Sequence, residues 1–216
     1  MAASLKKFFT IPNIISMARI AMIPVFIWAF QKGHDLLALA LVVVSGISDK
    51  LDGTIARRFN MVSDAGKWLD PMADKFTQVA LALLLFLRFH VSADAWMQAF
   101  SWVFLGFIGK EVIMLLFALF MLMTGKRPAA AEIWGKAATV VFYVVMGILL
   151  LAGPEVGVLE RYLPWAVLPP LVMQIMVVGA LVVTVMAFLG YIPDTYRKLF
   201  KEGKEEKNRA TLGEDL

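Results

Sequence analysis

The 216-residue sequence contains no cysteine and only two histidines. The absence of cysteine excludes disulfides and thiolate metal sites. Charged residues are also scarce, at 18% of the chain, whereas hydrophobic residues make up 60% and the mean hydropathy is +0.75. A composition this apolar is typical of an integral membrane protein, and the length leaves room for one membrane domain with short tails.

The sequence also lacks internal repeats, low-complexity tracts and the ten-residue alternating segments of a membrane β-barrel. No small-residue cleavage site of the Ala-x-Ala kind follows the first apolar run, so we expect this run to be a retained membrane span. Because backbone groups in lipid must form hydrogen bonds internally, the apolar runs are predicted to be helices.

Six apolar runs approach the roughly 20 residues that a helix needs to cross a bilayer. The sequence therefore predicts an all-α integral membrane protein with six transmembrane helices. The membrane domain is expected over residues 1–193 and a charged cytoplasmic tail over 194–216. A short juxtamembrane helix is expected over residues 4–9, where two lysines precede two phenylalanines. The predicted spans are approximately 12–31, 36–58, 66–89, 95–123, 133–152 and 164–190.

Lysine and arginine are distributed unequally outside these spans. Fourteen lie on the side of the two termini, and the other side holds three, Lys32, Arg88 and Arg161. This asymmetry predicts that both termini are cytoplasmic. Further cations inside the apolar runs are expected to face the helix bundle or a wet cavity, since charge in lipid costs a few kcal/mol or more. Snorkelling to the cytoplasmic headgroups is the alternative, above all for Lys50 and Lys75. These cations are Arg19, Lys50, Lys75 and Lys110.

Four aspartates lie near the cytoplasmic ends of the second and third predicted spans. Asp49 and Asp52 are three residues apart, and Asp70 and Asp74 are four apart, so each pair shares a helix face. Two adjacent antiparallel helices would bring the four carboxylates together, where without compensation they would repel one another. Hard oxygen ligands favour Mg²⁺ or Mn²⁺, so the pattern predicts a metal site. A purely structural salt-bridge network is the alternative, but four acids are too many for helix pairing alone.

The spacing of these residues carries a family resemblance. The pattern Asp49-x-x-Asp52-Gly53-x-x-Ala56-Arg57, eight residues, Gly66-x-x-x-Asp70-x-x-x-Asp74 resembles the signature of the CDP-alcohol phosphatidyltransferase family at every defined position. The resemblance implies an enzyme in which an acceptor hydroxyl attacks the lipid-side phosphorus of a CDP-linked lipid and CMP is released.

The resemblance also implies roles for the residues of the motif. Asp49, Asp52, Asp70 and Asp74 would bind metal, expected as two Mg²⁺ or Mn²⁺ ions. Asp70 and Asp74 would be catalytic, with Asp74 as the general base. Gly53, Ala56, Arg57 and Gly66 would bind CDP-diacylglycerol, although the three small residues taken alone equally suit close helix packing.

Other segments bear on the acceptor. Ile11–Arg19 and Leu69–Lys75 resemble the branch of the family that contains phosphatidylglycerophosphate synthases and CDP-dependent cardiolipin synthases. Lys110, next to Glu111, stands where this branch commonly has arginine, whose bidentate fork a lysine cannot imitate. A basic pocket for a phosphate-bearing acceptor is nevertheless expected near the metal, although loop charges near the membrane are the simpler interpretation for Arg127. The predicted pocket residues are Lys110, Lys136, Arg19 and Arg127.

These expectations combine into a phosphatidylglycerophosphate synthase that uses glycerol 3-phosphate, because its dianion would occupy such a pocket fully. The alternative within the family is a cardiolipin synthase that uses phosphatidylglycerol. The resemblance implies a homodimer among membrane lipids, and we expect no nucleic-acid partner. A metal-ion transporter is the alternative from another class, but the acids gather at one membrane face and no broken pair of spans marks a midplane site.

Overall fold

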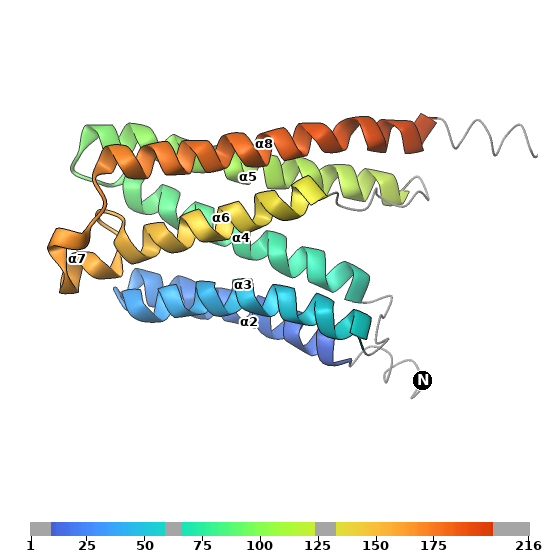
Figure 1. The fold of residues 1–216 in the computed structure, drawn as a ribbon, viewed down its shortest axis with the longest axis horizontal. Helices are drawn as coiled ribbons and strands as arrows, with labels where there is room; N and C mark the ends of the chain where they lie inside the picture. Colours follow the sequence, from blue (N-terminus) through green and yellow to red (C-terminus); the bar gives the residue numbers. More distant parts are fainter. Residues whose placement is uncertain (1–9, 59–65, 124–132, 201–216) are drawn as a thin grey trace, which may run out of the picture.

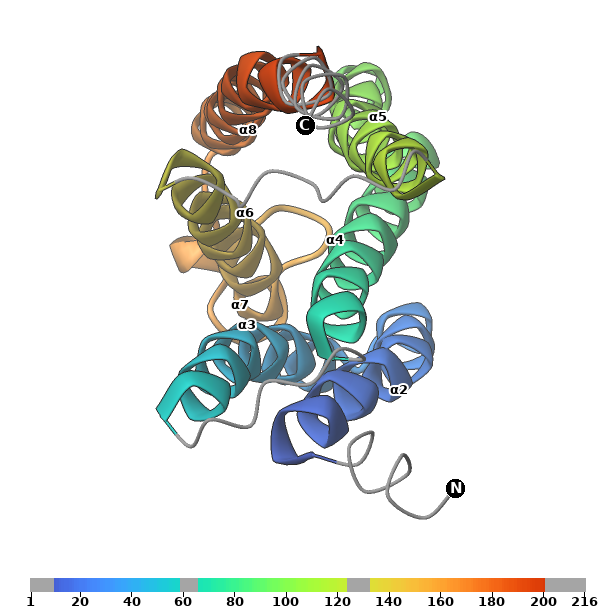
Figure 2. The ribbon, with the colours of Figure 1, turned by 90° about the vertical axis from the view of Figure 1, so that its right-hand side faces the viewer.

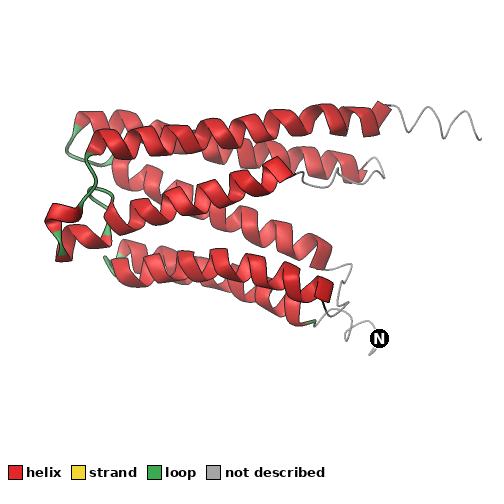
Figure 3. Cartoon of the chain, in the orientation of Figure 1, coloured by secondary structure: helices red, strands yellow, loops and turns green. Residues whose placement is uncertain are grey.

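The computed structural model describes residues 10–58, 66–123 and 133–200, and within these ranges the chain is helical with no strand (Figures 1 and 3). The juxtamembrane segment at residues 4–9 and the tail beyond Phe200 lie outside the described residues. The elements are α2 (Ile11–Gln31), α3 (Asp35–Arg58), α4 (Gly66–His90), α5 (Ala95–Met123), α6 (Ile133–Ala152), α7 (Val158–Tyr162), the 3₁₀ turn η1 (Pro164–Ala166) and α8 (Pro170–Phe200).

Local sequence signals account for the ends of these helices. Pro12 lies in the first turn of α2, where its missing N–H costs nothing. After α2 the chain turns at Gly33, whose φ of +71° suits glycine, and the His34 amide donates to the Ala29 carbonyl over 2.9 Å. This tight reversal makes α2 and α3 antiparallel neighbours.

The last predicted span differs most from the structure. A helix was expected from residue 164, but α7 and η1 occupy the approach and the long helix begins only at Pro170. The consecutive prolines Pro169 and Pro170 explain the late start, because proline disfavours helical geometry in the residue before it and is well placed in a first turn. The helix then runs to Phe200, beyond the end of the span predicted at residue 190.

Six long helices form a closed ring in the order α3, α2, α4, α5, α8 and α6, seen end-on in Figure 2. Each helix packs against its two neighbours in this order. Two short connections, before α3 and before α5, and the α7 segment lie at one end of the ring. The start of α4 and the end of α3 lie at the other, which we call the aspartate end.

Aromatic and aliphatic side chains fill the interior. Phe89, Phe104 and Phe107 are almost fully buried, and rings of α4, α5 and α6 contact one another within this core. Large apolar side chains such as Trp96, Ile175 and Met186 are instead exposed on the outside. An exterior this apolar suits a lipid environment, since soluble proteins rarely expose large contiguous apolar patches.

Four described helices are long and apolar enough to cross a membrane, namely Ile11–Gln31, Ala95–Phe117, Gly135–Ala152 and Pro170–Gly190. The prediction of an all-α integral membrane protein is therefore confirmed. That α3 and α4 also span the membrane stays a prediction. These two helices are the ones that carry the aspartate motif.

Candidate active site

The two halves of the aspartate motif are not direct neighbours. The sequence suggested that α3 and α4 would pack side by side, but α2 packs extensively against both, whereas α3 and α4 make few contacts with each other. Figure 2 shows α2 beside both helices at the aspartate end. The carboxylates of α3 and α4 are therefore brought together around a third helix, and the expectation of a simple helix pair was wrong.

Arg19 of α2 links the two halves. Its side chain is 0% exposed, and Nη1 lies 2.8 Å from Asp49 Oδ1 on α3 and 3.5 Å from Asp70 Oδ1 on α4. The carboxylates themselves remain accessible, with 30% of the Asp49 side chain and 41% of the Asp70 side chain exposed. The arrangement thus places a buried cation beneath two carboxylates that a ligand can reach.

Asp74 lies one turn after Asp70 and is held by neutral donors. The Tyr143 hydroxyl of α6 donates to Asp74 Oδ1 over 3.0 Å, and Gln78 Nε2 donates to Asp74 Oδ2 over 2.7 Å. Gln78 lies one turn further along α4 and is itself buried. Neither donor was predicted from the sequence, although the i,i+4 spacing of Gln78 from an aspartate on an apolar helix was a usable signal.

A second charged cluster lies between α4 and α5. The buried Glu111 carboxylate accepts hydrogen bonds from both Lys75 and Lys110. Two ammonium groups and one carboxylate leave the cluster with a charge of +1. Because Lys75 directly follows Asp74, this cluster adjoins the aspartate site on α4. The prediction that intramembrane cations face the bundle is confirmed for Arg19, Lys75 and Lys110, whose side chains are 0%, 22% and 12% exposed.

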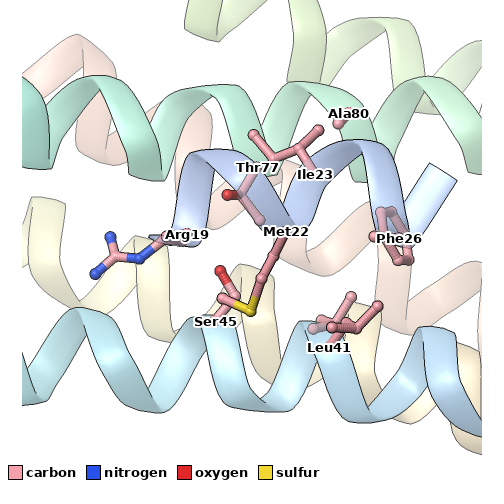
Figure 4. Close-up of a pocket in the computed structure, with 9 residues that line it drawn as sticks. Arg19, Met22, Ile23, Phe26, Leu41, Ser45, Thr77 and Ala80 are labelled. Carbon is pink, nitrogen blue, oxygen red and sulfur yellow. The ribbon is translucent and has the colours of Figure 1, made fainter. Parts of the chain in front are cut away.

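A small cavity continues from Arg19 into the bundle between α2, α3 and α4 (Figure 4). It is lined mainly by apolar side chains such as Met22, Phe26 and Leu41, together with Ser45, whose hydroxyl is buried and has no hydrogen-bond partner among the described residues. Its volume is about 10 Å³. That is room for at most one water molecule, so this cavity is too small for a larger ligand.

The structure describes only some of the remaining predicted site residues. Gly66 opens α4, and Lys136 is exposed on α6. The structure describes only the helical backbone of α3 at five further residues, Lys50, Asp52, Gly53, Ala56 and Arg57. Arg127 lies outside the described residues. No three acidic or histidine side chains among those described are arranged to hold a metal ion. The side chain of Asp52, the fourth carboxylate of the motif, is not among the side chains described.

The donor chemistry of the site nevertheless fits a hard divalent cation. Asp49, Asp70 and Asp74 offer only carboxylate oxygens, which Mg²⁺ and Mn²⁺ prefer. The single positive charge of Arg19 offsets only one of the two negative charges of Asp49 and Asp70, and a cation that binds the same carboxylate oxygens competes with its guanidinium.

A family model described as CDP-alcohol phosphatidyltransferase matches residues 9–186. The chain belongs to this family. The matched region includes the whole aspartate motif, Arg19, Glu111 and Tyr143. The protein is therefore a membrane transferase of phospholipid biosynthesis, as the resemblance of the motif indicated, and the transporter alternative is not supported.

Individual relatives of this phosphatidyltransferase fall into two groups by name. It is 33% identical to a cardiolipin synthase (CMP-forming) of Streptomyces coelicolor. The similarity extends over 150 residues, or 66% of each of the two chains. It is 30% identical to a CDP-diacylglycerol–glycerol-3-phosphate 3-phosphatidyltransferase of Bacillus subtilis, covering 66% of this chain and 77% of the relative. A Pseudomonas fluorescens protein with the latter name is 28% identical, over 91% of this chain and 95% of its own.

Proposed function

We propose that this phosphatidyltransferase transfers a phosphatidyl group from CDP-diacylglycerol to glycerol 3-phosphate, forming phosphatidylglycerol phosphate and CMP. The similarity that extends over most of both chains, to the Pseudomonas fluorescens protein, supports this substrate pair. The single structural observation that carries the choice of acceptor is the Lys75–Glu111–Lys110 cluster, which adds positive charge beside Asp74.

In the proposed reaction the acceptor hydroxyl oxygen forms a bond to the lipid-side phosphorus, and the bond from that phosphorus to the oxygen of CMP breaks. Asp74 takes the proton of the hydroxyl. Its carboxylate suits this role because its orientation is fixed by Tyr143 and Gln78, so a reacting group meets a defined lone pair. Arg19 keeps Asp49 and Asp70 in place on either side of α2.

Asp49, Asp70 and Asp74, with Asp52, are the proposed ligands of Mg²⁺ or Mn²⁺. When bound, such ions neutralise the diphosphate and stabilise the charge that develops during phosphoryl transfer. Gly53, Ala56, Arg57 and Gly66 are proposed to contact CDP-diacylglycerol. The active site and both termini are proposed to lie on the cytoplasmic face, and a homodimer stays a prediction.

The proposed acceptor site consists of Lys110 and Lys136, together with Arg127, which lies outside the described residues. Two ammonium groups around one carboxylate attract a phosphate dianion more strongly than a phosphodiester monoanion. Arg19 was also predicted to bind the acceptor, but its guanidinium is engaged by Asp49 and Asp70. Its part in acceptor binding requires release from these carboxylates.

A cardiolipin synthase activity is the second candidate, and the relative from Streptomyces coelicolor favours it. One assay separates the two. Purified protein in mixed micelles receives radiolabelled CDP-diacylglycerol, Mg²⁺ or Mn²⁺, and either glycerol 3-phosphate or phosphatidylglycerol. We expect CMP release with glycerol 3-phosphate that a metal chelator stops. CMP release with phosphatidylglycerol alone would replace the proposed function by the second candidate, and no CMP with any alcohol would refute both.

A further inference from the structure

The Asp74 carboxylate is held from two helices at once. Gln78 of α4 donates to one oxygen and Tyr143 of α6 donates to the other. Each carboxylate oxygen has two lone pairs, so one acceptor direction on each oxygen remains open after these bonds. The two donors therefore define the direction in which Asp74 can receive a proton or a cation.

The Tyr143 side chain extends from α6 past α3 to this carboxylate on α4. A methyl group added at Gly46 of α3 would lie 3.6 Å from Cγ and Cδ1 of the Tyr143 ring, so the ring already rests against the bare backbone there. Gly46 precedes Asp49 by three residues and shares its helix face. Because α6 packs on α3 and makes no extensive contact with α4, the tyrosine is a link from α6 to the second half of the aspartate motif.

We propose that Tyr143, assisted by Gln78, is a positioning residue that sets the orientation of the Asp74 carboxylate for catalysis. The inference rests on the proposed function, in which Asp74 accepts the proton of the acceptor hydroxyl. With Tyr143 absent, Oδ1 loses its only described donor and the carboxylate can rotate about its side-chain bonds. Misplacement of a catalytic group by about 1 Å costs on the order of 100-fold in rate.

A purely structural role makes a different prediction. Buried tyrosine hydroxyls usually find a hydrogen-bond partner, and such a bond can serve only to hold α6 in place. In that case its loss lowers the folded fraction and leaves the turnover of the folded enzyme unchanged. Positioning instead lowers the kcat of the folded enzyme, whatever the change in stability, and leaves substrate affinity nearly constant.

The test compares Tyr143→Phe and Gln78→Met with wild type in the CMP-release assay. Both variants nearly keep the size of the side chain and remove the polar group that donates to Asp74. Two variants at the opposite end of the ring are matched controls. Tyr162→Phe removes an exposed hydroxyl, and Gln98→Met removes a hydrogen bond to the Ser92 carbonyl.

We expect Tyr143→Phe to lower the kcat of the folded enzyme about 10-fold and the double variant to lower it further, with each KM within about twofold and with a lowered unfolding temperature from the lost hydrogen bond. Both controls should keep wild-type kcat. A folded Tyr143→Phe enzyme with wild-type kcat would overturn the inference while leaving the proposed function intact. If Tyr143→Phe does not fold, Gln78→Met decides by the same criterion. A wild-type enzyme that releases no CMP would overturn both.

Discussion

At the aspartate end of the ring, charged side chains penetrate between the helices and find partners there, whereas at the opposite end they line an open pocket of about 500 Å³. Arg19, Lys75 and Lys110 each contact a carboxylate at the first end. At the second end, Lys32, Arg88 and Arg161 form no ion pair with any described residue. All three are exposed.

Burial of charge has different consequences at the two ends of the ring. Charges in the open pocket keep most of their hydration, so they need no partners and contribute little to stability. Charges between the helices lose hydration and persist only where partners compensate for it. The costly arrangement occurs where the family motif lies, which agrees with a catalytic role for that end.

The largest expected effect is the loss of a motif carboxylate. Asp70→Asn removes the charge that a metal or the diphosphate site requires while keeping the shape, so CMP release should fall by about 10³-fold or more. Circular dichroism and gel filtration should show a folded protein. The matched control is Asp35→Asn in the open pocket, which should keep wild-type activity. An active Asp70→Asn enzyme would remove Asp70 from the proposed site.

Replacement of Arg19 tests how much its ion pairs at the aspartate end contribute to the free energy of unfolding. Arg19→Met leaves Asp49 and Asp70 close together without their cation, and we expect a loss of about 2–3 kcal/mol in the free energy of unfolding. The value is below that for a fully buried pair because both carboxylates are partly exposed. Thermal unfolding in detergent measures it, with Arg161→Met as the control that should change little. Equal losses in the two variants would contradict the comparison between the ends.

The basic cluster predicts a selective effect on the acceptor. Lys110→Met removes one of two ammonium groups, while Glu111 keeps its contact with Lys75. We expect the KM for glycerol 3-phosphate to rise about 10-fold and the KM for CDP-diacylglycerol to stay within about twofold. Lys32→Met is the control from the open pocket. A KM for glycerol 3-phosphate that does not change would place the acceptor phosphate elsewhere.

Most helix positions could be predicted from the sequence because apolar runs, prolines and the turn at Gly33 are local signals. The order of the helices in the ring could not. In lipid both faces of a helix are apolar, so no amphipathic stripe identifies its neighbours. For this reason the sequence paired α3 with α4, whereas α2 packs between them.

The candidate site likewise contains some features that the sequence predicts and others that only the tertiary structure shows. Fixed spacing predicted that the aspartates lie together, and Asp49 and Asp70 do share Arg19, whereas their roles in metal binding and catalysis stay predictions. The cost of charge in lipid correctly predicted that Arg19, Lys75 and Lys110 face the bundle. Their partners depend on tertiary contacts between helices far apart in sequence. A tyrosine such as Tyr143 in an apolar run has the same local pattern as a packing aromatic, so only the fold reveals its bond to Asp74.

The smallest expected effect belongs to Arg88 in the open pocket. Its Nε and Nη2 groups both donate to the Glu155 carbonyl, at 3.3 and 3.2 Å, so a single acceptor is involved. In Arg88→Met, water can replace this donor because the site is exposed, and we expect a stability loss of at most about 1 kcal/mol with CMP release within twofold of wild type. Thermal unfolding and the CMP-release assay measure the two quantities. A rise in the KM for glycerol 3-phosphate as large as that expected for Lys110→Met would mean that the two ends of the ring are coupled, and buried charge alone would no longer distinguish the catalytic end.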